Sequence, residues 1–112
     1  MKVTNLGEFE ELVLLVIGAL NDDAYSISIQ QELREQTGRS PSIGAMHSAL
    51  NRLENKGFIN SHEGGATKER GGRRKRFYQI TAAGKSALSK NHELRSGLIK
   101  LIPGMNTQTG LG

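Results

Sequence analysis

The basic residues of this sequence gather in one short segment. Six of the nine residues from Lys68 to Arg76 are basic, and Glu69 is the single acid among them. Glycines on both sides of the tip favour a hairpin loop. A flexible basic loop suits contact with nucleic-acid phosphates or with a minor groove, where the potential is most negative, although a solvated polar turn is the other interpretation. The expected contact residues are Lys68, Arg70, Arg73, Arg74, Lys75 and Arg76.

A second group of residues with binding chemistry falls on one face of a predicted helix. Met46, Leu50 and Leu53 form the inner face. The opposite face carries short polar side chains and no large apolar residue, which suits entry into the major groove of double-stranded DNA. Asn can read adenine, and Arg can read guanine or hold phosphate. The expected contacts are Ser42, Ala45, His47, Ser48, Asn51 and Arg52.

Position along this helix separates the expected roles. The N-terminal half of such a helix reads bases, which favours His47 and Ser48 as readers. Asn51 and Arg52 come later and are candidates for phosphate contact. His47 lies on a flank of the face and could equally be a solvent-facing residue without a role.

Catalytic and metal chemistry have little support in the sequence. The three histidines, His47, His62 and His92, lie in different segments, and no pair has the spacing of metal ligands within a helix. The chain has no cysteine, so thiolate sites and disulfides are excluded. No nucleophile motif or phosphate-binding loop is present. We therefore expect no catalytic residues, no metal and no cofactor, and a protein that is not an enzyme.

Length and charge narrow the class of protein further. The 112 residues correspond to one domain. The longest apolar run, 12–20, is far shorter than the roughly 20 residues that span a bilayer. The acids before this run do not fit the start of a signal peptide. We therefore expect a cytoplasmic protein without membrane contact. Residues 1–38 hold seven acids and two bases, whereas residues 39–112 hold four acids and thirteen bases. This polarity favours a polyanionic partner, with ordinary scatter of solvated charge as the alternative.

Apolar spacing and end signals predict the elements that position these residues. The apolar face of the first helix is so wide that burial on two sides is expected, and the second side needs a partner subunit or a ligand. The expected order is a helix over about 9–20, a helix from Tyr25 or Ser26 to Gly38, a helix from a Ser42 cap to Gly57, strands over 58–62 and 75–80, and a helix from a Thr81 cap to about Ile102.

This order is typical of a winged helix-turn-helix followed by a C-terminal dimerisation helix, which is a mainly α fold (α+β) with a small β-hairpin wing. We expect a DNA-binding domain over residues 1–80, the dimerisation helix over 81–102 and a disordered tail over 103–112. The last helix carries a heptad-like seam of Ala87, Asn91, Leu94, Leu98 and Leu101, although it could instead pack only on its own domain. The residues expected at the dimer interface are Leu12, Leu15, Leu94, Leu98 and Leu101.

Four stretches of the sequence share their pattern with a known family. They are 12–15 (LVLL), 24–29 (AYSISI), 42–59 (SIGAMHSALNRLENKGFI) and 71–84 (GGRRKRFYQITAAG). With these stretches the chain resembles the PadR family of winged-helix regulators over about residues 6–102, in its small subgroup with a single C-terminal helix. The resemblance implies a DNA-binding repressor that dimerises through that helix. In the family, a Tyr that commonly contacts phosphate stands where this chain has His47.

Partners other than DNA are also considered. Because some members of the family release DNA on binding phenolic acids or hydrophobic drugs, the resemblance adds a small hydrophobic or aromatic effector to the expected partners. A protein-interaction module could use the same fold and turn its basic wing to an acidic partner, but it should expose large apolar anchors on the third helix. A weakly specific nucleoid or RNA binder is the third possibility. The major groove of double-stranded RNA is too deep and narrow to admit a reading helix, which argues against RNA as the partner.

Overall fold

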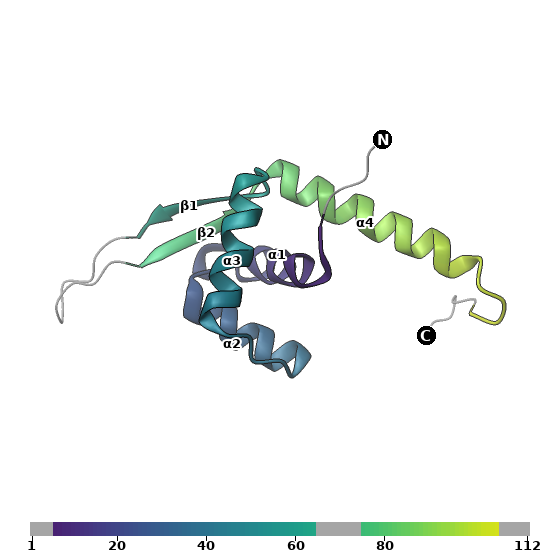
Figure 1. Ribbon diagram of the computed structural model, residues 1–112. Coiled ribbons are helices and arrows are strands. Elements are labelled where there is room, and N and C mark those ends of the chain that lie inside the picture. Colours follow the sequence, from purple (N-terminus) through teal and green to yellow (C-terminus); the bar gives the residue numbers. More distant parts are fainter. Residues whose placement is uncertain (1–5, 65–74, 106–112) are drawn as a thin grey trace.

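The computed structural model describes residues 6–64 and 75–105 (Figure 1). These residues form a mainly α structure with a two-stranded wing, which confirms the predicted fold class. The elements are α1 (Glu8–Leu20), the short 3-10 helix η1 (Asn21–Asp23), α2 (Ser26–Thr37), α3 (Ile43–Asn55), β1 (Ile59–Glu63), β2 (Arg76–Ile80) and α4 (Ala82–Lys100).

The turn between α2 and α3 follows the local signals in the sequence. Gly38 ends α2 in the left-handed region with a φ of 77°, which glycine adopts without steric cost. Ser42 caps α3, because its Oγ accepts the backbone N–H of Ala45 at 3.0 Å. Between these two ends, the Gln30 side chain donates a hydrogen bond to the carbonyl of Pro41 at 2.8 Å. The start of α3 is therefore fixed against the middle of α2.

The core lies between α1, α2 and α3 and is closed by the base of the hairpin (Figure 1). On α1, Leu14 is fully buried whereas its neighbour Leu15 is 47% exposed. One side of this wide apolar helix therefore packs in the core of its own domain, and the side that carries Leu15 stays exposed to solvent. The buried apolar residues of the core cluster are Val13, Leu14, Val16, Ile17, Ala24, Ile29, Leu33, Met46, Ala49, Leu50, Leu53, Ile59 and Tyr78.

The hairpin is attached to the helices at its base. Its two strands pair antiparallel over five residues each, with Ile59 and Tyr78 buried against the core. The backbone N–H of Tyr78 donates to the carbonyl of Ala24 at 2.9 Å, which joins β2 to the connection between α1 and α2. The tip of the hairpin lies outside the described residues, and so do the predicted contacts Lys68, Arg70, Arg73 and Arg74.

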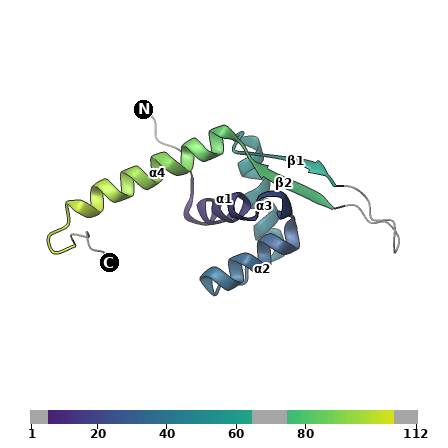
Figure 2. The same cartoon turned by 180° about the vertical axis from the view of Figure 1, so that it is seen from behind.

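Helix α4 begins against the body and then leaves it. Thr81 caps the helix by accepting the backbone N–H of Gly84 at 3.0 Å. A side chain at Gly84 has no room, because its Cβ would lie 2.3 Å from the carbonyl oxygen of Phe58. Gly84 and Ala87 are the buried residues of this fully described helix. Its remaining turns project from the body on the side opposite the hairpin (Figures 1 and 2).

In the described part of the chain, no helix combines the length and the apolar character needed to cross a bilayer. Of the expected tail, residues 103–105 follow α4 as a turn, and residues 106–112 lie outside the described residues.

Candidate nucleic-acid interface

Helix α3 has two faces with opposite burial. Met46, Leu50 and Leu53 are buried on its inner face, as the apolar spacing predicts. Short side chains dominate the outer surface of its first two turns, which lets a helix backbone approach the floor of a groove closely. All six predicted contact residues are exposed: Ser42, Ala45, His47, Ser48, Asn51 and Arg52.

A cleft of about 340 Å³ brings together residues that lie far apart in the sequence. His47 comes from α3, Ser26 from the start of α2, and Lys75 and Arg76 from the start of β2, at the end of the strand nearer the hairpin tip. The Nε2 atom of His47 lies 3.4 Å from Ser26 Oγ. The Nζ atom of Lys75 lies 4.2 Å from the centre of the Tyr25 ring, a cation–π contact that holds the ammonium beside the cleft. We call this site the wing-base cleft; its basic and hydroxyl groups suit a phosphate.

Aromatic contacts fix the floor of the wing-base cleft. The ring of Tyr25 meets Phe77 of β2 edge to face, with 5.5 Å between the ring centres. The backbones of the same two residues form an isolated antiparallel bridge. On its other side Phe77 stacks on His62 of β1 at 6.0 Å. The start of β2, which carries Lys75 and Arg76, is therefore held in a fixed position relative to α2.

Two basic residues of α3 are tied to a buried carboxylate of α1. Glu10 is 6% exposed. Its Oε2 atom accepts a hydrogen bond from Nε of Arg52, and its Oε1 atom accepts one from Nζ of Lys56 at 2.7 Å. Arg52 lies on the predicted outer face, but this ion pair holds its guanidinium toward α1. We call these three residues the Glu10 triad.

The triad keeps Glu10 charged. Burial alone would raise the pKa of the Glu10 carboxyl, but hydrogen bonds from Lys56, from Arg52 and from the backbone of Gly7 lower it, and the net pKa lies below the usual carboxyl value. This role of Glu10 was not predicted from the sequence. The available signal was an acid three residues before Val13, on the core-facing side of α1, where a charge needs a partner.

One large apolar side chain stays exposed at the very start of α3, one turn before the buried Met46. Ile43, the first residue of α3, is 49% exposed. Ile27, in the first turn of α2, is exposed to a similar degree, at 54%. Ile43 escapes burial because it lies three residues before Met46, where the buried stripe of α3 begins.

The residues predicted for a dimer interface lie on α1 and on the projecting part of α4. Leu94, Leu98 and Leu101 are between 53% and 75% exposed. Leu15 is also exposed, whereas Leu12 is half-buried and packs against the edge of its own core. The angle of α4 against α1 is supported by an ion pair between Arg95 and Glu11 at 2.8 Å.

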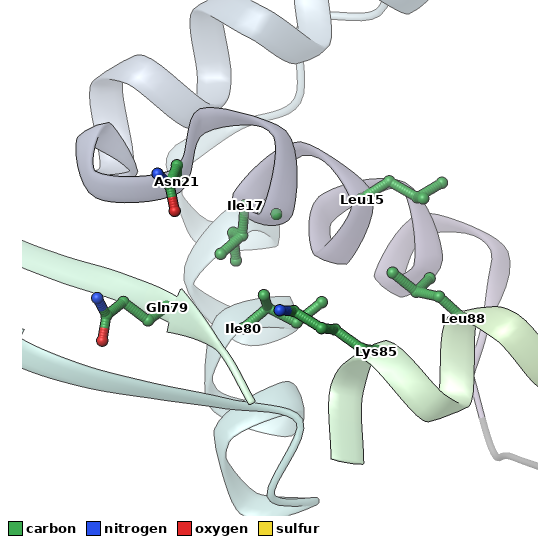
Figure 3. A pocket seen from close by; sticks show the side chains of 8 residues that line it. Leu15, Ile17, Asn21, Gln79, Ile80, Lys85 and Leu88 are labelled. Atoms are coloured by element: carbon green, nitrogen blue, oxygen red, sulfur yellow. The ribbon is translucent and has the colours of Figure 1, made fainter. Parts of the chain in front are cut away.

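A second cleft, of about 470 Å³, lies between α1, β2 and the first turns of α4 (Figure 3). Leu15 and Ile17 of α1 face Ile80 and Leu88 across it (Figure 3). Polar groups reach the same space from Asn21, Gln79 and Lys85. We call it the α4-base cleft. Among residues 6–64 and 75–105, no three acidic or histidine side chains gather closely enough to hold a metal ion.

Comparison with known proteins agrees with this arrangement. The model of the transcriptional regulator PadR-like family matches residues 13–90. A PadR family transcription regulator of Clostridium difficile is 25% identical, with 85% of this chain and 94% of that chain covered and a TM-score of 0.71. A transcriptional regulator of Clostridium thermocellum, 23% identical, shares the fold with a TM-score of 0.66 over 82% of this chain and 86% of that chain.

A sequence relative points the same way. A protein of Lysinibacillus sphaericus, described as uncharacterized, is 34% identical over 86 residues, which are 75% of this chain and 74% of that protein. The family model spans well over half of the chain, from α1 into α4. The protein therefore belongs to the PadR-like family of transcriptional regulators.

Proposed function

We propose that this protein binds double-stranded DNA with sequence specificity, as a homodimer, and represses transcription. The observation that carries the proposal is the wing-base cleft beside the exposed face of α3. A helix with small outer side chains suits the major groove, and the cations next to it suit the phosphates that border that groove. Membership of a family of transcriptional regulators supports the same function.

We assign different contacts to different parts of the interface. The contact with Ser26 turns the His47 ring toward the wing-base cleft, which favours phosphate for His47 and leaves Ser48 as the base reader. Ser42 and Ala45 are small enough to let the backbone approach. Asn51 and Arg52 lie later in the helix and are assigned to phosphate. Arg52, whose Nε is bound to Glu10, would use its terminal N–H groups, since its side chain is 52% exposed. The wing residues assigned to phosphate are Lys68, Arg70, Arg73, Arg74, Lys75 and Arg76.

Dimerisation is proposed through α4. Three leucines stand exposed along the part of this helix that leaves the body, and a continuous apolar row of this kind is unfavourable in water. A two-fold dimer would present two copies of α3 to half-sites about 10 base pairs apart, or a multiple of that spacing. A dimer bound in this way would exclude polymerase from an overlapping promoter, which is the basis of the proposed repression.

Light scattering tests the dimer. We expect a dimer at micromolar concentration for the wild-type protein and a monomer for Leu98→Glu, because the new charge would be buried against the partner. Ile27→Glu is the matched control, since Ile27 and Leu98 are both 54% exposed and Ile27 lies on α2. A monomeric wild type would contradict this part of the proposal.

An effector site is proposed at the α4-base cleft. Its apolar walls with three polar groups suit a small hydrophobic or aromatic molecule with a polar end. A molecule bound there would touch α1, β2 and the start of α4 together, and could shift the helices that set the half-site spacing. Thermal shift with a panel of small aromatic compounds tests this proposal, and we expect Leu88→Glu to abolish any stabilisation.

DNA selection followed by a binding ratio tests the central proposal. The wild-type protein is used to select duplexes from a random pool, and its affinities for the selected site and for random DNA are then compared at fixed salt. We expect Ser48→Ala to lower the ratio by about tenfold, because a base contact carries discrimination and a phosphate contact does not. Ser86→Ala, at an exposed position of α4, is the control. If no sequence is enriched, the protein-interaction alternative gains support.

A further inference from the structure

The exposed side chain of Ile43 has no role in the contacts assigned so far. Isolated exposed apolar residues are common on protein surfaces and by themselves mean little. The position of Ile43 is what matters: it is the first residue of α3, and it is 49% exposed. The inference below rests on the proposed function, in which the first turns of this helix enter the major groove.

The neighbours of Ile43 leave it as the one long exposed side chain of the first turn. Ser42 uses its hydroxyl to cap the helix at the N–H of Ala45. Gly44 faces open space, because a Cβ placed there would have no heavy atom within 4 Å. The first turn contains no acid. A base edge that meets this turn therefore meets an aliphatic surface, and no charged or amide group competes for it.

Base chemistry decides which edge fits such a surface. In the major groove thymine presents a C5-methyl group, whereas the edges of the other bases present mainly hydrogen-bond donors and acceptors. An aliphatic chain over a donor or acceptor would remove its water without replacing the hydrogen bond, which is unfavourable. We propose that Ile43 contacts the C5-methyl group of thymine and makes thymine the preferred base at one position of each half-site.

The size of the effect follows from one methyl group. Burial of a methylene-sized group contributes about 0.8 kcal/mol, which corresponds to about a fourfold change in affinity. Deoxyuridine differs from thymidine only by the absence of that methyl group. Replacing thymine by uracil at the contacted position should therefore weaken binding about fourfold in each half-site, with all hydrogen bonds of the base pair unchanged.

The test combines this change in the DNA with a change in the protein. A site selected by the wild-type protein is prepared with each thymine replaced in turn by uracil, symmetrically in both half-sites. Affinities are measured by fluorescence anisotropy at fixed salt and pH for the wild type, Ile43→Ala and Ile43→Val. Ile102→Ala is the matched control, because Ile102 is 46% exposed, close to the 49% of Ile43, and lies beyond the end of α4. Thermal melting confirms that each variant folds.

We expect one uracil position to weaken the wild type about fourfold per half-site, to leave Ile43→Ala unaffected and to weaken Ile102→Ala as much as the wild type. Ile43→Val, which keeps part of the aliphatic surface, should retain part of the effect. The inference is overturned if the selected site holds no thymine, if no uracil position weakens the wild type, or if Ile43→Ala keeps the full effect. Selection without any sequence preference would refute the proposed function as well, so the two failures are distinguishable.

Discussion

Replacement of Glu10 by Gln tests the strongest polar contact between α1 and α3. The variant keeps the size of the side chain and an oxygen that can accept from the N–H of Gly7, which lies 3.2 Å from Oε1 of Glu10. It removes the negative charge that faces Arg52 and Lys56. The change therefore isolates the charge of the Glu10 triad and leaves the packing of α1 almost untouched.

The magnitude follows from the exposure of the three side chains. Breaking a fully buried ion pair costs about 3–5 kcal/mol, and an exposed pair contributes about 0–1 kcal/mol. The Glu10 side chain is 8% exposed, but the side chains of Arg52 and Lys56 are 52% and 27% exposed and can regain water. We therefore expect a loss of about 1–2 kcal/mol, which corresponds to a fall in Tm of about 4–8 °C for a domain of this size.

Circular dichroism melts at one fixed protein concentration measure this loss. The pKa of Glu10 is lowered in the folded protein, so its contribution to stability is present above the ordinary carboxyl pKa and is lost as the pH falls through the lower, folded-state pKa. The difference in Tm between wild type and Glu10→Gln should therefore be full at pH 7 and should shrink in acid.

Glu8→Gln is the control for this experiment. Its ion pair with Arg39, at 3.0 Å, joins side chains that are 68% and 47% exposed, so we expect a change within about 0.5 kcal/mol. This expectation is refuted if Glu10→Gln and Glu8→Gln have the same Tm at pH 7. It is also refuted if the difference in Tm between wild type and Glu10→Gln grows as the pH falls.

Two further predictions concern the interface and the attachment of α4. Lys75→Gln should weaken binding to all DNA sequences alike and, with two copies in a dimer, reduce the slope of log affinity against log salt by about 1.8. Lys100→Gln, at the far end of α4, is the control and should leave the slope unchanged. An unchanged slope for Lys75→Gln would remove the wing-base cleft from the interface. Gly84→Ala should destabilise the protein by about 1–3 kcal/mol in denaturant melts, because its Cβ would meet the Phe58 carbonyl at 2.3 Å. Gly97→Ala, in the same helix, places its Cβ in open space and should stabilise the protein by about 0.5–1 kcal/mol. Equal effects of the two substitutions would contradict the close approach of Gly84 to the Phe58 carbonyl.

Much of the fold could be predicted because its signals are local. The caps at Ser42 and Thr81 and the left-handed glycine at position 38 lie within one turn of the ends that they set. The apolar spacing of α3 gives its inner and outer faces directly, because the period of a helix is fixed by its backbone. The same rule does not extend to Ile43, since a helix end can project past the core that buries its middle.

The candidate site could be predicted in its parts but not in its assembly. The basic hairpin and the polar face of α3 are visible in the sequence as two separate groups. His47 of α3 meets Ser26 of α2, 21 residues away, beside Lys75 and Arg76 at the start of β2. This meeting depends on how α2, α3 and β2 pack. From the sequence alone, His47 falls on a flank of the helix, and that position fits a DNA contact and a solvent-facing side chain equally well.

The sequence by itself determined the order of elements, their ends, the buried face of α3 and the concentration of positive charge in one segment. These properties depend on residues within a few positions of one another, through backbone period, capping and turn preference. Only the tertiary structure decided that Glu10 holds Arg52 and Lys56 across 42 and 46 residues, and that Leu94 and Leu98 of α4 stay exposed whereas Leu88 packs against the core. Contacts between distant segments depend on the distances and angles at which helices pack, and these follow from the fit of many side chains at once, which no local pattern encodes.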